Sequence, residues 1–275
     1  MEISSKQNGN GTSQHNPVVS RDEWLAARKE LWIKEKELTR MNDALRAKRG
    51  RLPWVKIDKE YIFDAPDGKR SLAELFQGKS QLIVQHFMFG PGWKEGCVGC
   101  SFTADHVDGA LKHLVHHDVS FVAISRAPIE EIETFKKRMN WHFTWVSSFH
   151  TDFNYDYNVS FTKEDQDLGI AYYNYNSRVF EGEELSGHSV FYMNEHGEIF
   201  HTYSTYSRGG EQLLGTYIYL DWTPKGRNET GPGQNLTDWV RHHDKYEAEG
   251  FVDHTGRFRE KTNSASCCSS EGPLS

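Results

Sequence analysis

Two cysteines three residues apart are the residues in this sequence best suited to do chemistry. The Cys-x-x-Cys motif, Cys97 to Cys100, follows an apolar run at residues 81–89 and a turn-forming Gly-Pro-Gly segment. At the start of a helix, this spacing places both sulfurs on one side of the first turn, where a disulfide can close. The positive end of a helix also stabilises a thiolate, which is the attacking form of cysteine. The motif therefore predicts thiol–disulfide exchange, in which Cys97 attacks and Cys100 resolves the mixed disulfide.

Two further residues near the motif are candidates for binding a substrate. Trp93 lies four residues before Cys97, where an aromatic side chain can shield a redox pair. Arg126 follows the apolar run at residues 119–125, so we expect it at the carboxyl edge of a sheet, where α/β folds build their sites. There it can stabilise a thiolate or bind a substrate anion; a structural salt bridge is the alternative. Lys94 either helps to hold Cys97 as a thiolate or is simply solvated.

The segments around the motif alternate between strand and helix. Residues 81–89 and 119–125 are apolar along most of their length, which is typical of strands buried on both faces. Residues 101–117 and 128–139 are predicted helices, and the second has a proline near its start and acidic residues in its first turn. This order predicts a parallel βαβ core.

The segment after this core, residues 145–187, is aromatic, polar and irregular, and we interpret it as an insertion. Its tyrosines are expected either to form a wall for an organic substrate or to cover the core. Residues 189–193 and 199–203 are predicted strands of a hairpin, because a turn-forming Asn-Glu-His-Gly segment joins them. A last helix is predicted at residues 236–246.

A long helix is predicted near the N-terminus, at residues 20–48. Ser20 and Glu23 have the spacing of a capping box, and Gly50 and Pro53 end the helix. Its apolar side chains form a narrow stripe that repeats every seven residues: Trp24, Leu31, Leu38 and Leu45. We expect the stripe to pack on the body of the same chain. The alternative is a homodimer, because a heptad stripe suits a second helix.

These segments divide the chain into four parts. We predict a disordered N-terminus at residues 1–17, a helix at 18–50, a domain with the insertion and a final helix at 51–250, and a disordered tail at 251–275. Both ends are polar, so they bury too little apolar surface to fold. The tail holds a second pair, Cys267 and Cys268, which we interpret as incidental.

Composition excludes several classes of function. The 275 residues include 32 basic and 39 acidic side chains, a net charge of −7, which argues against nucleic acid as a partner. No apolar run approaches the ~20 residues of a membrane span. The N-terminus lacks the basic start and apolar centre of a secretory signal, so we expect a cytoplasmic protein.

Several segments resemble the family catalogued as domain of unknown function 899. The segments that carry the resemblance are residues 19–24, 34–40, 52–55, 86–100, 122–128, 152–156 and 201–206. The resemblance implies a thioredoxin-like, peroxiredoxin-like three-layer α/β sandwich, here with an N-terminal helical extension and an aromatic-rich insertion. It also implies a dithiol–disulfide oxidoreductase activity on a thiol or disulfide substrate, with a reducing protein as partner. That reaction needs no cofactor.

One departure from the thioredoxin-like pattern opens a second interpretation. Such proteins typically carry a cis-proline before the strand that follows the active-site half, where this sequence has Gly187-His188-Ser189. Because that proline blocks metal capture by the two thiols, its absence makes His188 a candidate third ligand or proton donor. Cys97, Cys100 and His188 are therefore the alternative metal site, for copper or zinc, similar to copper-delivery proteins of the Sco type.

A second departure concerns peroxide chemistry. The layout before the core strand is similar to that of peroxiredoxins, which need a Thr or Ser three residues before the attacking cysteine. That position is Lys94 here, and their proline seven residues before the cysteine is replaced by Gly90. We therefore do not expect peroxide reduction through the usual site.

Overall fold

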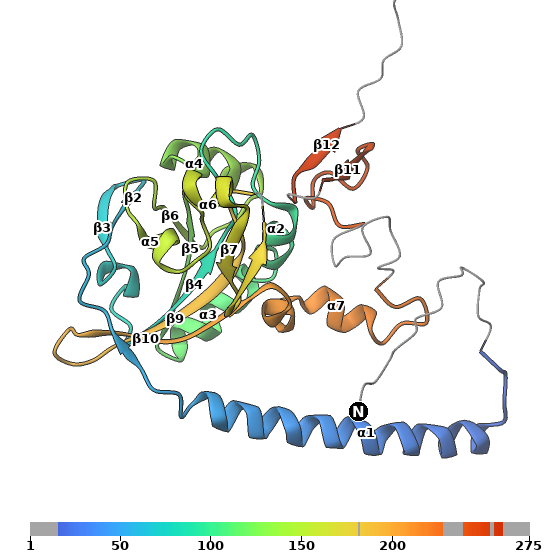
Figure 1. Cartoon of the computed structure of the whole chain (residues 1–275). Coiled ribbons are helices and arrows are strands. Elements are labelled where there is room, and N and C mark those ends of the chain that lie inside the picture. The colour runs from blue at the N-terminus through green and yellow to red at the C-terminus, as the bar shows by residue number, and fades with distance from the viewer. Residues whose placement is uncertain (1–15, 181, 228–238, 254–255, 261–275) are drawn as a thin grey trace, which may run out of the picture. The chain divides into compact units, whose positions relative to one another are not determined.

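The structure is a computed structural model that describes residues 16–180, 182–227, 239–253 and 256–260 (Figure 1). The chain forms two compact units, one ending at Leu52 and the other beginning at Pro53, and each is described by itself. Within the described residues, no helix combines the length and the apolar character needed to cross a membrane.

The described part of the first unit is one long helix, α1 (Arg21–Arg49), which Gly50 follows as its C-cap. The Glu23 N–H donates to Ser20 Oγ at 3.3 Å, and the Ser20 N–H donates to the Glu23 carboxylate at 2.9 Å. The predicted capping box is therefore present. The side chains of the predicted stripe are between 46% and 55% exposed: Trp24, Leu31, Leu38 and Leu45. Within the first unit, the described residues thus leave the stripe exposed.

The second unit is built on an eight-stranded sheet, with the order β1-β10-β9-β4-β5-β6-β2-β3. The three strands at its centre, β4, β5 and β6, are parallel, and the other pairs are antiparallel. The strands are β1 (Val55–Lys56), β2 (Ile62–Ala65), β3 (Gly68–Ser71), β4 (Gln81–His86), β5 (Val119–Ser125), β6 (Thr144–Ser147), β9 (Gly187–Met193) and β10 (Ile199–Tyr206).

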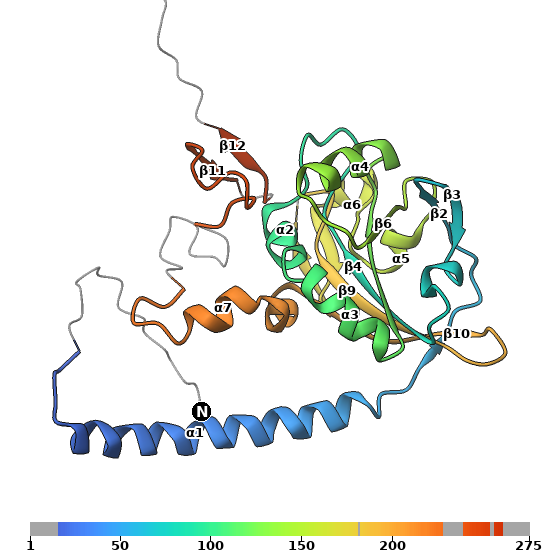
Figure 2. The same cartoon turned by 180° about the vertical axis from the view of Figure 1, so that it is seen from behind.

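The central strands bury side chains on both faces of the sheet, as their apolar sequences predicted. In β5, Val122 and Ile124 belong to one apolar cluster, whereas Phe121 and Ala123 belong to another. The helices that cover the sheet are α2 (Val98–Ala104), α3 (Asp108–His116), α4 (Ile129–Arg138) and α5 (Phe153–Asp156). The two opposite views show α5 on one face and α2 and α3 on the other (Figures 1 and 2). The predicted three-layer, thioredoxin-like sandwich is confirmed.

The helix predicted at residues 101–117 is in fact two helices, α2 and α3. Residues between them make tertiary contacts in addition to backbone bonds such as that from the Asp105 N–H to the Ser101 carbonyl oxygen. Asp105 Oδ1 accepts a hydrogen bond from Trp141 Nε1 at 2.8 Å, and His106 Nε2 accepts one from the Thr216 N–H at 3.0 Å. These contacts redirect the chain, so α2 is a short helix whose first turn holds the cysteines.

The aromatic insertion is more regular than predicted. It contains α6 (Lys163–Leu168) and a small sheet of β7 (Ile170–Tyr173) and β8 (Asn176–Val179). Thr162 forms a capping box with Asp165 at the start of α6, and Gly169, with φ +65°, ends the helix. The hairpin that follows, β9 and β10, was predicted and is present.

The C-terminal end differs most from expectation. Its elements are η2 (Ser207–Leu213), α7 (Gly215–Leu220), β11 (Gly250–Val252) and β12 (Phe258–Glu260). The remaining short helix, η1 (Glu74–Phe76), lies between β3 and β4. Residues 239–246, the described part of the predicted last helix, form turns and no helix. The predicted disorder is wrong for β11 and β12, because Phe258 anchors this hairpin in an apolar cluster with Val98, Phe102 and Leu214. Predicted disorder at residues 1–15 and 261–275 lies outside the described residues.

Candidate active site

The two cysteines lie where the chain leaves β4 and enters α2. Cys97 is the N-cap residue of α2, and Cys100 lies in its first turn. The Cys97 N–H donates to the Met88 carbonyl oxygen at 2.9 Å, and the Met88 N–H donates to Cys100 Sγ at 3.5 Å. Both thiols are free, with Cys97 6% exposed and Cys100 4% exposed. The helix start thus brings both predicted residues to one place.

The two thiols differ in acidity. A hydrogen bond from the Cys100 thiol lowers the pKa of Cys97, helped by the N–H groups of Cys100 and Gly99 and opposed by burial. The same thiol–thiol contact, together with burial and the charge of Cys97, raises the pKa of Cys100 well above its ordinary value. When one of the pair is ionised, the thiolate is therefore on Cys97, and Cys100 keeps its proton.

The hairpin of β11 and β12 covers Cys97. The Val98 N–H donates to the Gly256 carbonyl oxygen at 2.8 Å. A Cβ added to Gly256 would lie 2.9 Å from Cys97 Sγ, and the φ of Gly256 is +80°. Both facts favour glycine at this position. This part of the hairpin therefore covers Cys97, of which 6% remains exposed.

Trp93 belongs to the same buried apolar cluster as the two cysteines and is 8% exposed. The guanidinium of Arg257 lies over its ring, with Cζ 3.6 Å from the ring centroid. Trp93 and the exposed Lys94 both line a cavity of about 580 Å³ that the hairpin closes on the other side. Trp93, which was predicted to shield the redox pair, therefore forms part of the wall of this cavity.

Arg126 forms a salt bridge with Glu184, whose charge contributes to the raised pKa of Cys100. Its Nε donates to Glu184 Oε1 at 2.5 Å, and its Nη1 donates to the Tyr155 hydroxyl. Burial raises the pKa of Glu184 to about 7, opposed by the charge of Arg126 and by a hydrogen bond from Ser160. Arg126 does not line the cavity of about 580 Å³, nor the smaller cavity on the Cys100 side that is described next. The structure therefore holds Arg126 in a salt bridge, which was the alternative interpretation.

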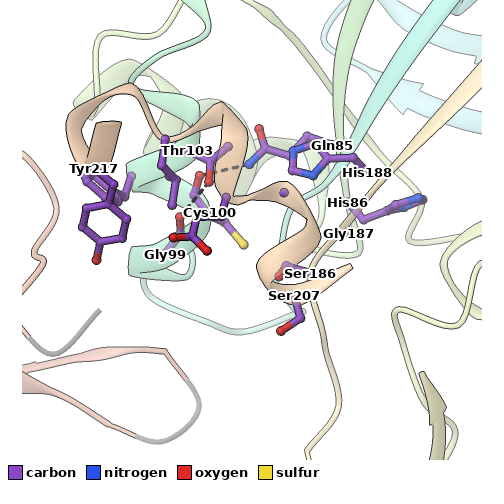
Figure 3. A pocket seen from close by; sticks show the side chains of 14 residues that line it. Gln85, His86, Gly99, Cys100, Thr103, Ser186, Gly187, His188, Ser207 and Tyr217 are labelled. Atoms are coloured by element: carbon purple, nitrogen blue, oxygen red, sulfur yellow. Dashed lines mark hydrogen bonds between the residues drawn. The ribbon is translucent and has the colours of Figure 1, made fainter. Parts of the chain in front are cut away.

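A second cavity, of about 200 Å³, lies on the Cys100 side of α2 (Figure 3). Gln85 Nε2 donates to the Cys100 carbonyl oxygen at 3.0 Å, and His188 is the cross-strand partner of Gln85. Gln85 Oε1 and His188 Nε2 are buried and have no hydrogen-bond partner in the described part of the chain. Burial lowers the pKa of His188 to about 4, so its ring is neutral at pH 7. His188 therefore lies near Cys100, but Cys97 does not line this cavity.

The alternative metal site can be compared with this geometry. Among the described residues, no three or more His, Cys, Asp or Glu side chains are grouped so that they could hold a metal ion. The spacing Cys97-x₂-Cys100-x₁₂-His113-x₃-His117 also fits a zinc finger. The fold instead places His113 in α3 and His117 directly after it, without forming such a group.

Several residues around the dithiol were missed by the sequence reasoning. Gln85 had a usable signal, because it is a polar residue in an otherwise apolar strand, and 2% of it is exposed. Gly256 and Arg257 had none, since their contacts with Cys97 and Trp93 join segments far apart in the chain. Glu184 is an acid within a polar segment and looks ordinary until its burial is known.

The strand order, with the Cys-x-x-Cys motif after the first parallel strand, makes the second unit a thioredoxin-like domain. Similar solved structures include peroxidoxin BcpB from Mycobacterium tuberculosis, with 12% identity, a TM-score of 0.40, and coverage of 60% of this chain and 95% of that chain. The bacterioferritin comigratory protein of Xanthomonas campestris has 9% identity and a TM-score of 0.39, covering 56% and 86%. A 2-Cys peroxiredoxin of Plasmodium vivax has 15% identity and a TM-score of 0.37, covering 60% and 90%. The fold is identified from its topology and not from these overall similarities.

The sequence itself matches the profile of a family described as "Bacterial protein of unknown function (DUF899)" over residues 13–246. This is most of the chain, so the protein belongs to that family, as the resemblance predicted. A comparison with curated proteins finds no match.

Proposed function

We propose that the protein is a thiol–disulfide oxidoreductase, in which Cys97 attacks and Cys100 resolves. One observation carries the proposal: two free thiols lie at the N-cap and in the first turn of α2, where the pKa of Cys97 is lowered and that of Cys100 is raised. Disulfide exchange needs an attacking thiolate and a second thiol within reach of the mixed disulfide. The reaction as proposed uses no cofactor.

The reaction has two exchange steps. First, the Cys97 thiolate attacks one sulfur of a substrate disulfide, so that a Cys97–substrate bond forms, the substrate S–S bond breaks and one substrate thiolate leaves. Second, Cys100 gives its proton to the departing thiolate or to solvent and attacks Cys97 Sγ, which forms the intramolecular disulfide and releases the second substrate thiolate. The substrate gains two electrons, and the protein dithiol loses two. A dithiol on a reducing partner protein restores the starting state.

The proposal includes a cytoplasmic location. In that compartment, glutathione and thioredoxin systems keep thiols reduced, so a dithiol can cycle between its two states with a reducing partner. Cell fractionation against cytoplasmic and membrane markers tests the location, and recovery outside the cytoplasmic fraction would contradict it.

Trapping of the mixed disulfide tests the reaction. With Cys267 and Cys268 replaced by serine, only Cys97 and Cys100 remain as thiols. In this background, Cys100→Ser is expected to accumulate a covalent adduct with bis(2-hydroxyethyl) disulfide, measured as a mass increase by one mercaptoethanol unit. With both active cysteines present, the expected product is instead an intramolecular disulfide, lighter by the two thiol hydrogens.

Cys97→Ser is the matched control, for which we expect neither adduct nor disulfide. Failure of the intact pair to form any reversible disulfide would show the proposal to be wrong. Metal analysis of the same preparations addresses the alternative site at Cys97, Cys100 and His188. Stoichiometric copper or zinc that is lost in Cys97→Ser would support metal binding instead.

The exposed stripe of α1 leads to a proposal about assembly. We propose that two copies of the chain pair through this stripe, because its seven-residue repeat suits a two-helix seam and the described residues of its own unit leave it exposed. Light scattering of the full chain is expected to give about twice the mass of a chain that starts at Gly50, after correction for length. The double variant Leu31→Glu/Leu38→Glu keeps the helix length and is expected to behave as a monomer. Equal assembly states in all three proteins would refute the pairing.

A further inference from the structure

A groove next to the segment that covers Cys97 has no role in the two exchange steps, and Cys97 itself does not line it. We call it the cationic groove. Its volume is about 580 Å³, which is within the range of small-molecule sites. The residues that line it are Gly92, Trp93, Lys94, Glu95, Lys245, Arg257, Phe258, Arg259 and Glu260.

Most charges of the cationic groove neutralise one another. Lys245 Nζ lies 2.7 Å from a Glu95 carboxylate oxygen and 3.1 Å from one of Glu260. Glu95 is also paired with Arg138, outside the groove, at 2.6 Å. Arg259 is paired with Asp253 at 2.7 Å. Both carboxylates of the groove are therefore already engaged by cations.

Lys94 and Arg257 are the two cations of the groove that have no ion-pair partner among the described residues. Arg257 Nε is buried and makes no hydrogen bond in the described part of the chain. Burial and the neighbouring charge of Arg259 lower the pKa of Arg257. The charges of Asp253, Glu183 and Cys97 oppose this shift. Because Arg257 Nε has no acceptor among the described residues, a bound anion would supply one.

The position of Arg257 is fixed by its surroundings. Its guanidinium stacks on the buried Trp93, 3.6 Å from the ring centroid. It directly follows Gly256, which contacts Cys97. A stacked, planar guanidinium can bind a carboxylate through two parallel N–H bonds, and this geometry is specific to carboxylates and similar oxyanions. An anion held by Arg257 therefore lies next to the segment that covers the attacking sulfur.

We propose that the cationic groove binds a carboxylate of the substrate, and that the substrate class is small disulfides whose thiol halves carry carboxylates. This inference rests on the proposed function and adds a substrate class to it. Arg257 and Lys94 hold the carboxylate, Trp93 positions the guanidinium, and the disulfide of the same molecule lies toward Gly256 and Cys97. The exchange steps and their electron balance are those already given.

Alkylation of Cys97 tests the anion site without any disulfide chemistry. The probes are iodoacetate, which carries a carboxylate, and iodoacetamide, which is its neutral counterpart of nearly the same size. The protein is Cys100→Ser with Cys267 and Cys268 also replaced by serine. The measured quantity is the ratio of the two rate constants at one pH and low salt, divided by the same ratio for free dithiothreitol. Because both reagents need the same thiolate, its fraction cancels.

We expect this ratio to be about tenfold higher than in the same protein carrying Arg257→Gln, the lower end of what one charge-assisted hydrogen bond provides. Arg257→Lys is expected to keep part of the preference, because it keeps the charge but not the planar fork. Lys112→Gln, an exposed residue of α3, makes the same change in net charge away from the groove and should leave the ratio unchanged. An equal ratio in the parent and in Arg257→Gln would overturn the proposal.

Two further measurements keep the test decisive. Circular dichroism melting shows whether Arg257→Gln folds; if it does not, the exposed Lys94→Gln replaces it, with an expected loss of about threefold in the ratio.

In the second measurement, the intact dithiol is oxidised with 3,3′-dithiodipropionate, a dianion, and with the neutral bis(2-hydroxyethyl) disulfide. The rate constant with each disulfide is divided by the rate constant of dithiothreitol with the same disulfide. Oxidation by both at equal scaled rates refutes the anion site and leaves the oxidoreductase standing. Oxidation by neither refutes the oxidoreductase itself.

Discussion

The two flanks of the dithiol are built from different parts of the chain and from different chemistry. The flank of Cys97 is charged, and it combines the loop at residues 92–95 with Lys245 and the hairpin residues 257–260. The flank of Cys100 rests on the sheet, where the neutral polar side chains of Gln85 and His188 lie side by side (Figure 3).

This difference matches the unequal acidity of the thiols. Cys97, at the N-cap, receives hydrogen bonds from the Cys100 thiol and from backbone N–H groups, which favour its thiolate. Cys100 is buried above the sheet, and the charge of Cys97 further disfavours its ionisation. One turn of helix therefore gives two cysteines with separate roles, because each faces a different environment.

The largest expected effect is on the rate of the first exchange, which should differ between the serine variants of the attacking and the resolving cysteine. In a background without Cys267 and Cys268, Cys97→Ser is expected to slow the first exchange with bis(2-hydroxyethyl) disulfide by about three orders of magnitude, because the remaining Cys100 keeps its proton. Cys100→Ser should retain the first exchange and lose only the second. Stopped-flow measurement of mercaptoethanol release gives both rates. Comparable rates for the two variants would mean that the different surroundings of the two cysteines do not decide which one attacks and which one resolves.

The Cys100 flank should also make stability depend on pH through His188. Its pKa is lowered to about 4 in the folded protein, against ~6.5 in an unfolded chain. Below pH 6.5 the unfolded state therefore binds a proton that the folded state refuses, so stability falls as the pH decreases toward 4. The slope approaches about 1.4 kcal/mol per pH unit, or roughly 2 kcal/mol between pH 6.5 and pH 5.

His188→Asn should remove this slope. Urea denaturation at several pH values compares it with the wild type, and the difference between the two curves isolates the histidine from other titrating groups. His196→Asn, at an exposed turn position, is the control and should keep the wild-type slope. If His188→Asn leaves the pH dependence of the free energy of unfolding unchanged, then protonation of this ring does not destabilise the folded protein.

The same contrast explains what the sequence could predict. The Cys-x-x-Cys motif, its strand and its helix were found because they depend on local patterns: continuous apolar residues, turn residues and short spacings. The capping box of α1 and the β9–β10 hairpin were found for the same reason. The fold class follows from the order of these local elements.

What could not be predicted depends on long-range contacts. The hairpin of β11 and β12 is polar in sequence, and the buried Phe258 anchors it through partners from α2 and α7. The pairing of Arg126 with Glu184 joins the end of β5 to the insertion, so Arg126 was a plausible substrate ligand until its partner was known. Single polar residues become informative only when their neighbours in space are known.

The substitution Gly256→Ala should loosen the part of the β11–β12 hairpin that lies against Cys97. Its φ of +80° and the 2.9 Å approach of the added Cβ to Cys97 Sγ both oppose any side chain. We expect the hairpin to shift and the alkylation of Cys97 by iodoacetamide to become about tenfold faster, equivalent to lowering the opening free energy by about 1.4 kcal/mol. Mass spectrometry of labelled peptides assigns the rate to Cys97.

Gly197→Ala is the matched control for that change. Its φ is +77°, but a Cβ there has nothing within 4 Å. Both variants should lose about 1 kcal/mol of stability from the left-handed backbone, and only Gly256→Ala should alter alkylation. If both or neither change the rate, the contact between Gly256 and Cys97 does not control access.

The smallest effect concerns the thiol–thiol contact itself. Because a hydrogen bond from Cys100 is the main cause that lowers the pKa of Cys97, Cys100→Ala should move the pH midpoint of Cys97 alkylation upward. Cys100→Ser retains a hydroxyl donor at the same place, so its midpoint should stay closer to that of the intact pair. The measurement is the rate with iodoacetamide from pH 5 to pH 10 in the background lacking Cys267 and Cys268. Identical midpoints in the alanine and serine variants would assign the acidity of Cys97 to the helix N-terminus alone, and the two flanks would then differ in burial but not in hydrogen bonding.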